Sequence, residues 1–271
     1  MSEKKKYKKV GLALSSGGWR GLAHLGVIKA LVKHGVPIDY IAGSSAGALV
    51  GGMYDALEDV DKVEEIIGGL RYKDLAKVFS DPYSSSGILK GEKVTKFLRG
   101  YMGDKKIEDL KIPFGAVTTD LKTGETVVLS QGGLVEGIRA SMSLPFVFEP
   151  VNYGKNLLVD GGASSPVPVE VVREMGAEVV IGVNLYGHAF PVENWEDNKL
   201  GRVGVAKLSY HLVMYQLAKR DVEKADLVIE PKVIERGFNI FFKVVHNQEA
   251  IKRGEEAVDV MIGEIKKLIE C

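Results

Sequence analysis

The sequence predicts an α/β fold in which helices cover both faces of a mainly parallel sheet, with extra helices toward the C-terminus. Strand-like and helix-like segments alternate through the first half of the chain. The 271 residues are 45% hydrophobic and 27% charged, as in globular proteins with a substantial core. We expect residues 1–271 to form a single domain, with its motif-bearing core at about 9–183 and a C-terminal helical part at about 200–271.

Apolar patterns define the first two strand–helix units. Val10–Leu14 is predicted to be a buried strand, and the helical spacing of apolar residues between Gly21 and Gly35 predicts a helix that stops before Pro37. Asp39–Gly43 and Ala46–Leu57 are the strand and helix of the second unit. Since consecutive strands of a sheet are usually neighbours, we expect these two strands to pair.

The rest of the chain follows the same logic of apolar runs and turn residues. In order, we predict a helix over 61–70, an exposed loop over 79–91, a helix over 92–101, strands over 113–119 and 125–130, a helix over 132–142, a hairpin over 151–159, a helix over 169–175 and a strand over 178–184. The last third is predicted as a loop over 186–200, a helix over 202–223, a strand over 226–230 and a helix over 247–269.

Charge and cysteine content narrow the function classes. Lys+Arg and Asp+Glu both number 36, so nothing favours a nucleic-acid partner. The single cysteine, Cys271, allows no disulfide within the chain and fits a reducing compartment.

No segment of the sequence has the pattern of a signal peptide or a membrane span. We therefore expect a cytoplasmic location. The five lysines before Val10 either stay solvated or draw the chain to an anionic membrane, as a peripheral contact at the inner membrane surface.

The pentapeptide Gly43-Ser44-Ser45-Ala46-Gly47 joins the second strand to its helix, with a serine at the apex of the turn. The flanking glycines have no Cβ to clash in a tight turn, so the Ser45 hydroxyl can be held out in a strained position. Amides at the start of the helix would stabilise an anion formed there. The pattern indicates the nucleophile of an acyl hydrolase; its alternative is an ordinary strand–helix connection.

The segment Ser15–Gly21, directly after the first strand, is a Gly-rich turn whose amides can cradle negative charge. One interpretation is a dinucleotide-binding turn, with Asp39 meeting a ribose. Against it, Ser16 stands where the motif has its first glycine. Asp39 also begins its predicted strand, whereas the ribose-binding acid belongs at the strand's end.

The other interpretation is an oxyanion hole formed by the amides of Gly17 and Gly18. If the first two strands are neighbours, this turn lies beside Ser45 and can supply the donors that acyl transfer requires about 3 Å from the oxyanion. Arg20 would pin the loop or contact a phosphate; its simpler role is a surface ion pair.

A serine nucleophile needs a base, and Asp160-Gly161-Gly162 places a carboxylate at the end of an apolar strand. The two glycines permit close approach of another backbone. As a lone aspartate, Asp160 has the alternative role of turn former or helix cap.

Histidine is the alternative base. His188 in a predicted loop, His211 in a helix and His246 near a helix start all follow Asp160 in the chain, as a Ser–Asp–His triad requires. His24 lies near the Gly-rich turn but comes too early in the chain. No histidine stands beside glycines at a strand end as Asp160 does.

Taken together, the three segments resemble the patatin-like phospholipase family. Ser16–Gly21 corresponds to that family's G-G-G-x-R-G oxyanion loop, with Ser16 where the family usually has glycine. Gly43–Gly47 matches its nucleophile elbow and Asp160–Gly162 its D-G-G/A motif. The similarity of layout runs from about Lys9 to about Val183. Supporting motif residues are Arg20, Gly21, Gly43, Gly47, Gly161 and Gly162.

The resemblance implies a three-layer α/β/α fold and a Ser45–Asp160 dyad that works without histidine, metal or cofactor. Gly17 and Gly18 would hold the oxyanion, and burial would raise the pKa of Asp160 toward the range of a useful base. The implied substrate is a lipid or acyl ester, such as a phospholipid or lysophospholipid. A carboxylesterase or thioesterase for small soluble acyl groups, and a non-enzymatic protein with a relict site, remain alternatives.

An acyl chain requires an apolar groove near the serine. The candidates are Trp19, Leu144, Pro145, Phe146 and Phe148, and two segments, 186–195 and 238–242, are candidates for a lid. Each of these positions has core packing as its alternative. The motifs indicate no oligomeric state.

Overall fold

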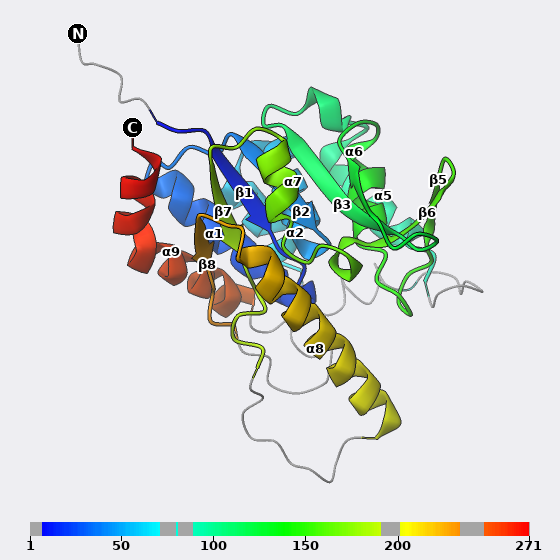
Figure 1. Cartoon of the computed structure of the whole chain (residues 1–271). Helices are drawn as coiled ribbons and strands as arrows, with labels where there is room; N and C mark the ends of the chain where they lie inside the picture. The colour runs from blue at the N-terminus through cyan, green and yellow to red at the C-terminus, as the bar shows by residue number, and fades with distance from the viewer. Residues whose placement is uncertain (1–6, 71–79, 81–88, 191–200, 234–246, 271) are drawn as a thin grey trace.

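The computed structural model describes residues 7–70, 80, 89–190, 201–233 and 247–270 (Figure 1). Within these residues eight strands form one sheet in the order β5-β6-β3-β2-β1-β7-β8, and β4 pairs with β3. The strands are β1 (Val10–Leu14), β2 (Tyr40–Ser44), β3 (Phe114–Asp120), β4 (Thr126–Leu129), β5 (Val151–Tyr153), β6 (Asn156–Asp160), β7 (Val179–Val183) and β8 (Leu227–Ile229).

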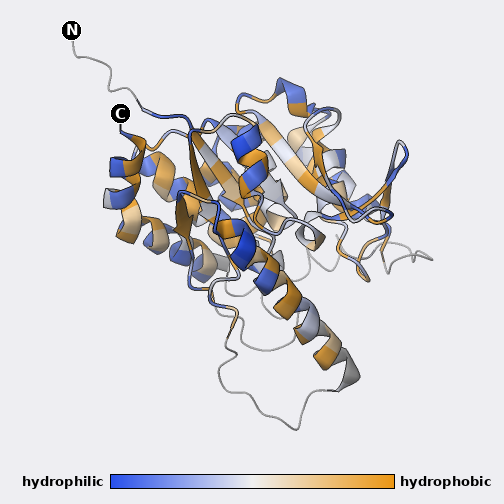
Figure 2. Cartoon of the chain, viewed as in Figure 1, coloured by the Kyte–Doolittle hydropathy of each residue, from blue (hydrophilic) through white to orange (hydrophobic). Residues whose placement is uncertain are grey.

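The sheet is mostly parallel, as predicted, and β1 and β2 are neighbours. Strands β3, β2, β1, β7 and β8 run parallel, whereas β4 and β6 pair antiparallel with β3, and β5 pairs antiparallel with β6. The parallel strands β1 and β7 are buried along their whole length and are rich in Val, Leu and Ile, the composition expected of strands covered on both faces. Figure 2 shows these central strands as largely hydrophobic.

Helices cover both faces of the sheet. One core cluster joins it to the helices α1 (Leu22–Lys33), α2 (Ala46–Leu57), α3 (Val60–Val63), α5 (Glu92–Met102), α6 (Leu134–Ser141) and α9 (Asn247–Ile269). A second cluster joins it to α7 (Val169–Glu174) and α8 (Arg202–Val222). Successive strand residues alternate between the clusters: Leu12 and Leu14 belong to the first, Ala13 to the second. This is the predicted three-layer arrangement.

The C-terminal helix α9 packs directly against α1. A Cβ at Gly26 would lie 1.8 Å from the carbonyl oxygen of Ile251, and one at Gly254 would lie 2.1 Å from that of Ala23. The two helix backbones therefore touch at glycines, one on each helix. In this way the last helix of the chain joins the core that holds the motifs.

The predicted elements agree closely with the observed ones, with a few differences. The helix predicted over 61–70 is α3 followed by a π-helical segment, Glu64–Gly68. Most of the predicted loop 79–91, and the part of the loop 186–200 from residue 191 onward, lie outside the described residues. Among the helices of the described ranges, none combines the length and the apolar character needed to cross a bilayer.

Candidate active site

The ends of β2 and β6 meet on one edge of β3. Val117 pairs with Ser44, the last residue of β2, and the next residue, Thr118, pairs with Asp160, the last residue of β6. The other edge of β3 is occupied by β4 along these same positions. The parallel strand and the antiparallel strand therefore end beside each other, which brings Ser45 and Asp160 together from positions 115 residues apart.

Ser45 lies at a strained turn between β2 and α2. Its backbone has φ 54° and ψ −113°, values that non-glycine residues rarely adopt. The turn has no room for side chains at its glycines: a Cβ at Gly43 would lie 2.3 Å from the Gly47 backbone, and one at Gly47 would lie 2.2 Å from the carbonyl oxygen of Leu14. At both positions the observed backbone leaves room only for glycine.

The Ser45 hydroxyl donates a hydrogen bond of 2.5 Å to Oδ2 of Asp160. Oδ1 of the same carboxylate accepts the Gly162 amide at 2.8 Å, and the Asp160 side chain is buried. Burial raises the pKa of Asp160 to about 6, because a carboxylate loses its hydration there, while the hydrogen bonds from Ser45 and Gly162 oppose the rise. The Asp160 carboxyl therefore titrates closer to neutrality than an ordinary aspartate.

The backbone amide of Ser45 has its own partner, which the sequence did not reveal. It donates to Oγ of Ser141 at 2.8 Å, and that hydroxyl donates to the carbonyl of Val117 at 2.6 Å. Ser141 is fully buried in α6. It ties the strained turn to β3.

The Gly-rich turn after β1 packs on the start of α2. A Cβ at Gly21 would lie 2.4 Å from that of Ala46, so the turn and the residue after Ser45 are in direct contact. Gly18 has φ 57°, and a side chain added there would meet no atom within 4 Å. Gly18 thus faces open space, whereas Gly17 is buried and a Cβ there would lie 2.9 Å from the Leu185 side chain.

Three side chains hold this turn in place. Arg20 is buried, its Nε donates to the Gly17 carbonyl at 3.3 Å, and its guanidinium lies 4.6 Å from the ring centroid of Tyr186. The Tyr186 hydroxyl lies 2.9 Å from Oγ of Ser16. Ser16, which stands where the family usually has glycine, therefore has a hydrogen-bond partner in Tyr186. Of the roles considered for Arg20, the structure favours pinning the loop over a surface ion pair.

Asp39 and His24 are engaged elsewhere. The Asp39 carboxylate accepts the Val10 amide at 2.7 Å, at the start of β1 and thus at the opposite end of the strand from the Gly-rich turn. This contact argues against the dinucleotide interpretation. Nε2 of His24 bonds the Ser15 carbonyl at 2.8 Å, and burial lowers the pKa of His24 to about 4, so the ring is neutral near pH 7.

Neither His188 nor His211, the two later histidines that the structure describes, is part of the Ser45–Asp160 contact. The Ser45 hydroxyl donates directly to Asp160, leaving no bridging imidazole between them. His211 lies on α8 with its ring 6.3 Å from that of Tyr210, and His188 lies in the segment after β7. His246 falls outside the described residues.

The candidate groove residues separate into different environments. Phe148 is buried, with the Arg139 guanidinium 4.7 Å from its ring centroid, so it belongs to the core. Phe146 is 88% exposed, and Trp19, Leu144 and Pro145 are half-buried. Trp195 and the segment 238–242 lie outside the described residues.

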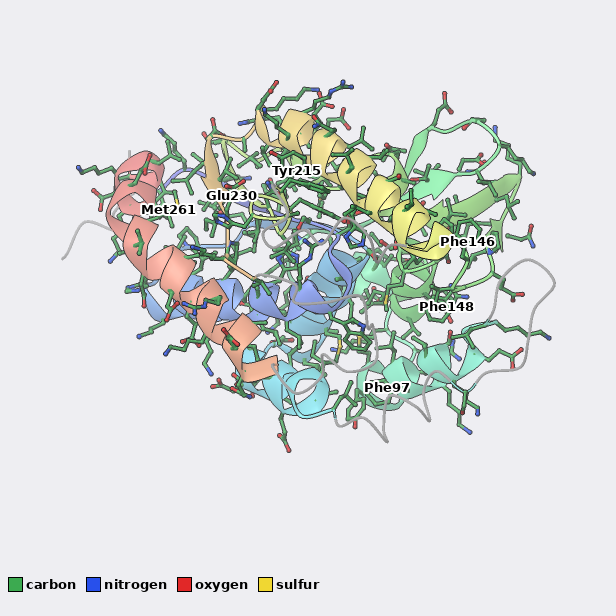
Figure 3. All side chains as sticks on the ribbon, turned by 90° about the horizontal axis from the view of Figure 1, so that it is seen from below. Phe97, Phe146, Phe148, Tyr215, Glu230 and Met261 are labelled. Carbon is green, nitrogen blue, oxygen red and sulfur yellow. The ribbon has the colours of Figure 1, made fainter. Side chains whose placement is uncertain are left out.

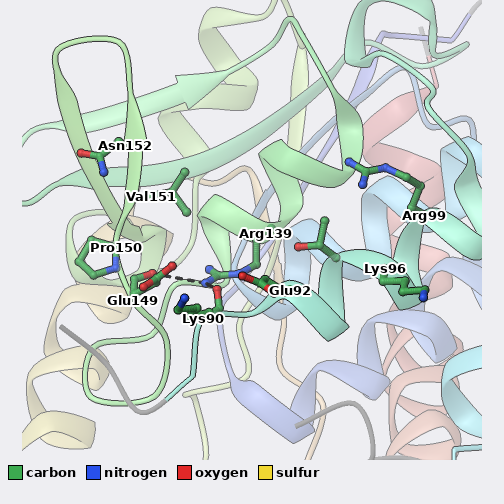
Figure 4. A pocket seen from close by; sticks show the side chains of 10 residues that line it. Lys90, Glu92, Lys96, Arg99, Arg139, Glu149, Pro150, Val151 and Asn152 are labelled. Atoms are coloured by element: carbon green, nitrogen blue, oxygen red, sulfur yellow. Dashed lines mark hydrogen bonds between the residues drawn. The ribbon is translucent and has the colours of Figure 1, made fainter. Parts of the chain in front are cut away.

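A cavity of about 520 Å³ lies beside α5, α6 and the β5–β6 hairpin (Figure 4). Arg139 lines it and donates to the Lys90 carbonyl and to Oγ of Ser143, both at 2.7 Å. None of the predicted catalytic or oxyanion residues lines this cavity. The candidate Ser45–Asp160 site is therefore recognised by its hydrogen bonds and backbone geometry rather than by this cavity.

Comparison with known proteins places these features in a family. The family model "Patatin-like phospholipase" matches residues 12–173, more than half of the chain. An NTE family protein of Mycobacterium tuberculosis is 40% identical over 191 residues, which are 70% of this chain and 53% of that protein. Human patatin-like phospholipase domain-containing protein 6 is 32% identical over 186 residues, 65% of this chain and 13% of the relative.

Lysophospholipase NTE1 of Debaryomyces hansenii is 35% identical over 184 residues, 65% of this chain and 12% of the relative. The chain spans about half the length of the mycobacterial relative and a smaller share of the other two. The crystal structure of VipD from Legionella pneumophila has a TM-score of 0.61 at 15% identity, over 96% of this chain and 67% of VipD, which shows a shared fold. On the match of the family model, this chain belongs to the patatin-like phospholipase family.

Proposed function

We propose that this chain is a serine acyl hydrolase that cleaves fatty-acyl ester bonds of phospholipids or lysophospholipids. The observation that carries the proposal is the 2.5 Å hydrogen bond from the Ser45 hydroxyl to the buried Asp160 carboxylate, at a strained turn. Family membership and relatives named as phospholipases or a lysophospholipase support the choice of a lipid ester.

In the proposed mechanism Ser45 is the nucleophile and Asp160 the base. Asp160 Oδ2 accepts the hydroxyl proton while Ser45 Oγ attacks the ester carbonyl carbon, and the amides of Gly17 and Gly18 stabilise the oxyanion. Collapse of the tetrahedral intermediate breaks the ester C–O bond, and the proton on Asp160 passes to the leaving alcohol. A water molecule then gives its proton to Asp160 and attacks the acyl-enzyme carbonyl. As the bond from that carbon to Ser45 Oγ breaks, Asp160 passes the proton to Ser45 Oγ, which releases the fatty acid and restores both residues.

The electrostatics of Asp160 fit this role. An aspartate with its ordinary pKa near 4 is a weak base toward an alcohol. Burial raises the pKa of Asp160 to about 6, so the carboxylate is still ionised at neutral pH and is a better proton acceptor. This supports direct proton transfer without histidine.

We also propose that residues 1–271 form one domain that acts in the cytoplasm, in peripheral contact with the inner membrane surface. The packing of α9 against α1 through Gly26 and Gly254 supports the single domain. The lone cysteine fits a reducing compartment.

The proposed nucleophile can be tested with a fluorophosphonate probe, which reacts covalently with activated serines. Mass spectrometry is expected to find the adduct on Ser45, and Ser45→Ala should not be labelled. Ser44→Ala is the matched control: the Ser44 hydroxyl is buried without a partner, so its removal should leave labelling intact. Absence of labelling in the folded wild-type protein would contradict the proposed function.

The rate of hydrolysis should follow the ionisation of Asp160. Because only the ionised carboxylate can accept the proton, kcat/KM for a soluble p-nitrophenyl ester should rise about tenfold per pH unit below the pKa of about 6 and level off above it. Initial rates measured from acid to mildly alkaline pH check this. A midpoint near 4 would show that the environment of Asp160 does not perturb it in solution.

Tyr186 is expected to act as a positioning residue for the oxyanion loop. Tyr186→Phe removes the hydroxyl that meets Ser16 but keeps the ring beside Arg20, so kcat should fall about fivefold to tenfold, as expected for one lost hydrogen bond of about 1 kcal/mol, while KM stays the same. Ser16→Ala should cause a similar loss, and the double variant should lose no more than either alone. Additive losses of kcat in the double variant would show that the two hydroxyls act independently, which contradicts the prediction.

A further inference from the structure

Helix α8 buries one side and exposes the other. Met214 and Ala218 pack into the second core cluster. On the opposite side Val205, Leu212 and Val213 are 52%, 44% and 53% exposed, and their spacing of seven and eight residues places them on one helical face. The other exposed residues of this face are Ala206, Ser209 and Gln216, followed by Lys219 and Arg220, which lie seven residues after Leu212 and Val213. A largely apolar stripe that ends in two cationic residues thus faces outward, and the N-terminal half of α8 extends away from the sheet (Figure 1).

Most charged residues of α8 are basic. The helix contains four Lys and Arg residues and one acid, Asp221, in a chain whose total charge is zero. The Asp221 carboxylate is turned toward the protein, where it accepts the Val167 amide at 2.9 Å. The helix therefore presents an apolar stripe together with an excess of positive charge, a combination complementary to an anionic lipid surface.

Phe146 is a second exposed apolar feature, on a different segment. Its side chain is 88% exposed and its backbone has φ 69°, a conformation that strains a bulky residue. No burial of the ring within the protein offsets this strain. An aromatic side chain held outward in this way fits insertion into an apolar medium outside the protein.

Both features adjoin the Ser45–Asp160 site. Phe146 follows Ser143, whose carbonyl accepts the Asp160 amide at 3.0 Å. On α8, burial and the charge of Asp160 raise the pKa of Tyr210, which places this helix within electrostatic reach of the dyad. Figure 3 views the molecule from the side crossed by α8 and labels Phe146 in the same view. Each of the two segments is thus linked to Asp160, one by the hydrogen bond to the Ser143 carbonyl and the other through Tyr210.

We propose that Val205, Leu212 and Val213 of α8, together with Phe146, form a docking face that seats the enzyme on an anionic phospholipid bilayer. The proposal rests on the proposed function, since it states where a lipid hydrolase meets its aggregated substrate. Docked on this face, the protein would bring the Ser45 side of the sheet toward the headgroups. The positive charge of α8 would attract the anionic surface while the apolar side chains enter the interface.

Vesicle flotation tests the docking face. The wild-type protein should float with vesicles of mixed phosphatidylglycerol and phosphatidylcholine, and less with phosphatidylcholine alone. Leu212→Ser/Val213→Ser should lower the partition coefficient about tenfold, equivalent to about 1.4 kcal/mol, and Phe146→Ser should also lower it. The matched control is Val260→Ser: Val260 is 86% exposed but lies on α9, on the other side of the molecule from the tip of α8, so binding should not change.

Soluble p-nitrophenyl butyrate separates docking from chemistry. The wild-type protein, Leu212→Ser/Val213→Ser and Val260→Ser should hydrolyse it at the same rate, whereas on vesicles the two docking-face variants should be slower. Unchanged flotation of both variants would overturn the docking face. The docking face would also be overturned if light scattering showed that Leu212→Ser/Val213→Ser turns a dimer into a monomer while flotation stays the same. A wild-type protein that floats but hydrolyses no ester would contradict only the proposed function. The docking face would still be supported by the lower flotation of the docking-face variants.

Discussion

Replacing the Asp160 carboxylate with an amide should lower kcat/KM for ester hydrolysis about 10³-fold to 10⁴-fold while the protein stays folded. An asparagine at this position keeps an oxygen for the Gly162 amide, which preserves the contact at 2.8 Å. It cannot take the proton from Ser45, so the hydroxyl stays a weak nucleophile. Steady-state hydrolysis of a p-nitrophenyl ester by Asp160→Asn, with a circular dichroism melt to show folding, measures the effect.

Asp120→Asn is the matched control for this experiment. Asp120 is also buried near the end of β3, but its Oδ1 accepts the backbone amides of Lys122 and Leu157 and has no contact with Ser45. We expect this variant to keep its activity per folded molecule. Near-normal activity in Asp160→Asn would refute the dyad, and loss of activity in His188→Ala would favour a histidine base instead.

Gly47→Ala should destabilise the protein by about 3 kcal/mol or more, the upper range for inserting a methyl group into a closely packed site. The new Cβ would lie 2.2 Å from the Leu14 carbonyl oxygen and 2.8 Å from the Leu14 side chain. Both belong to β1 in the middle of the sheet, so the strand cannot move without disturbing its neighbours. The free energy of unfolding from urea titration measures the loss.

Gly263→Ala shows what the same substitution does without the clash. Gly263 lies inside α9, and a Cβ there would meet no atom within 4 Å. Because alanine has the higher helix propensity, this variant should gain about 0.5–1 kcal/mol. A Gly47→Ala protein as stable as Gly263→Ala would show that the turn adapts more easily than the observed contacts allow.

Local chemistry made much of the fold predictable. Helix 46–57 was predicted with its observed bounds, because its apolar pattern begins directly after the turn at Ser45. The closing helix 247–269 was also predicted correctly. Its partner was not, since the contact between Gly26 and Gly254 joins positions far apart in the sequence and neither glycine has a local signature.

The candidate site was predictable to a similar extent. Ser45, Asp160 and the glycines around them occur in motifs that describe a local backbone shape. Ser141 and Tyr186 carry no such motif: one contacts the Ser45 amide from 96 residues away, and the other contacts Ser16 from 170 residues away. No local pattern distinguishes these two from any other buried serine or tyrosine.

The sequence by itself determined the elements, the sharp turn at Ser45 and the residue types able to perform acyl transfer, because apolar periodicity and the lack of a glycine Cβ act over a few neighbouring residues. Only the tertiary structure decided that β2 and β6 end beside each other on β3, and that Asp160 is buried there. The distance between Ser45 and Asp160 and the raised pKa of Asp160 follow from those two facts. Pairing and desolvation depend on atoms that are remote in the chain, so they exist only once the protein has folded.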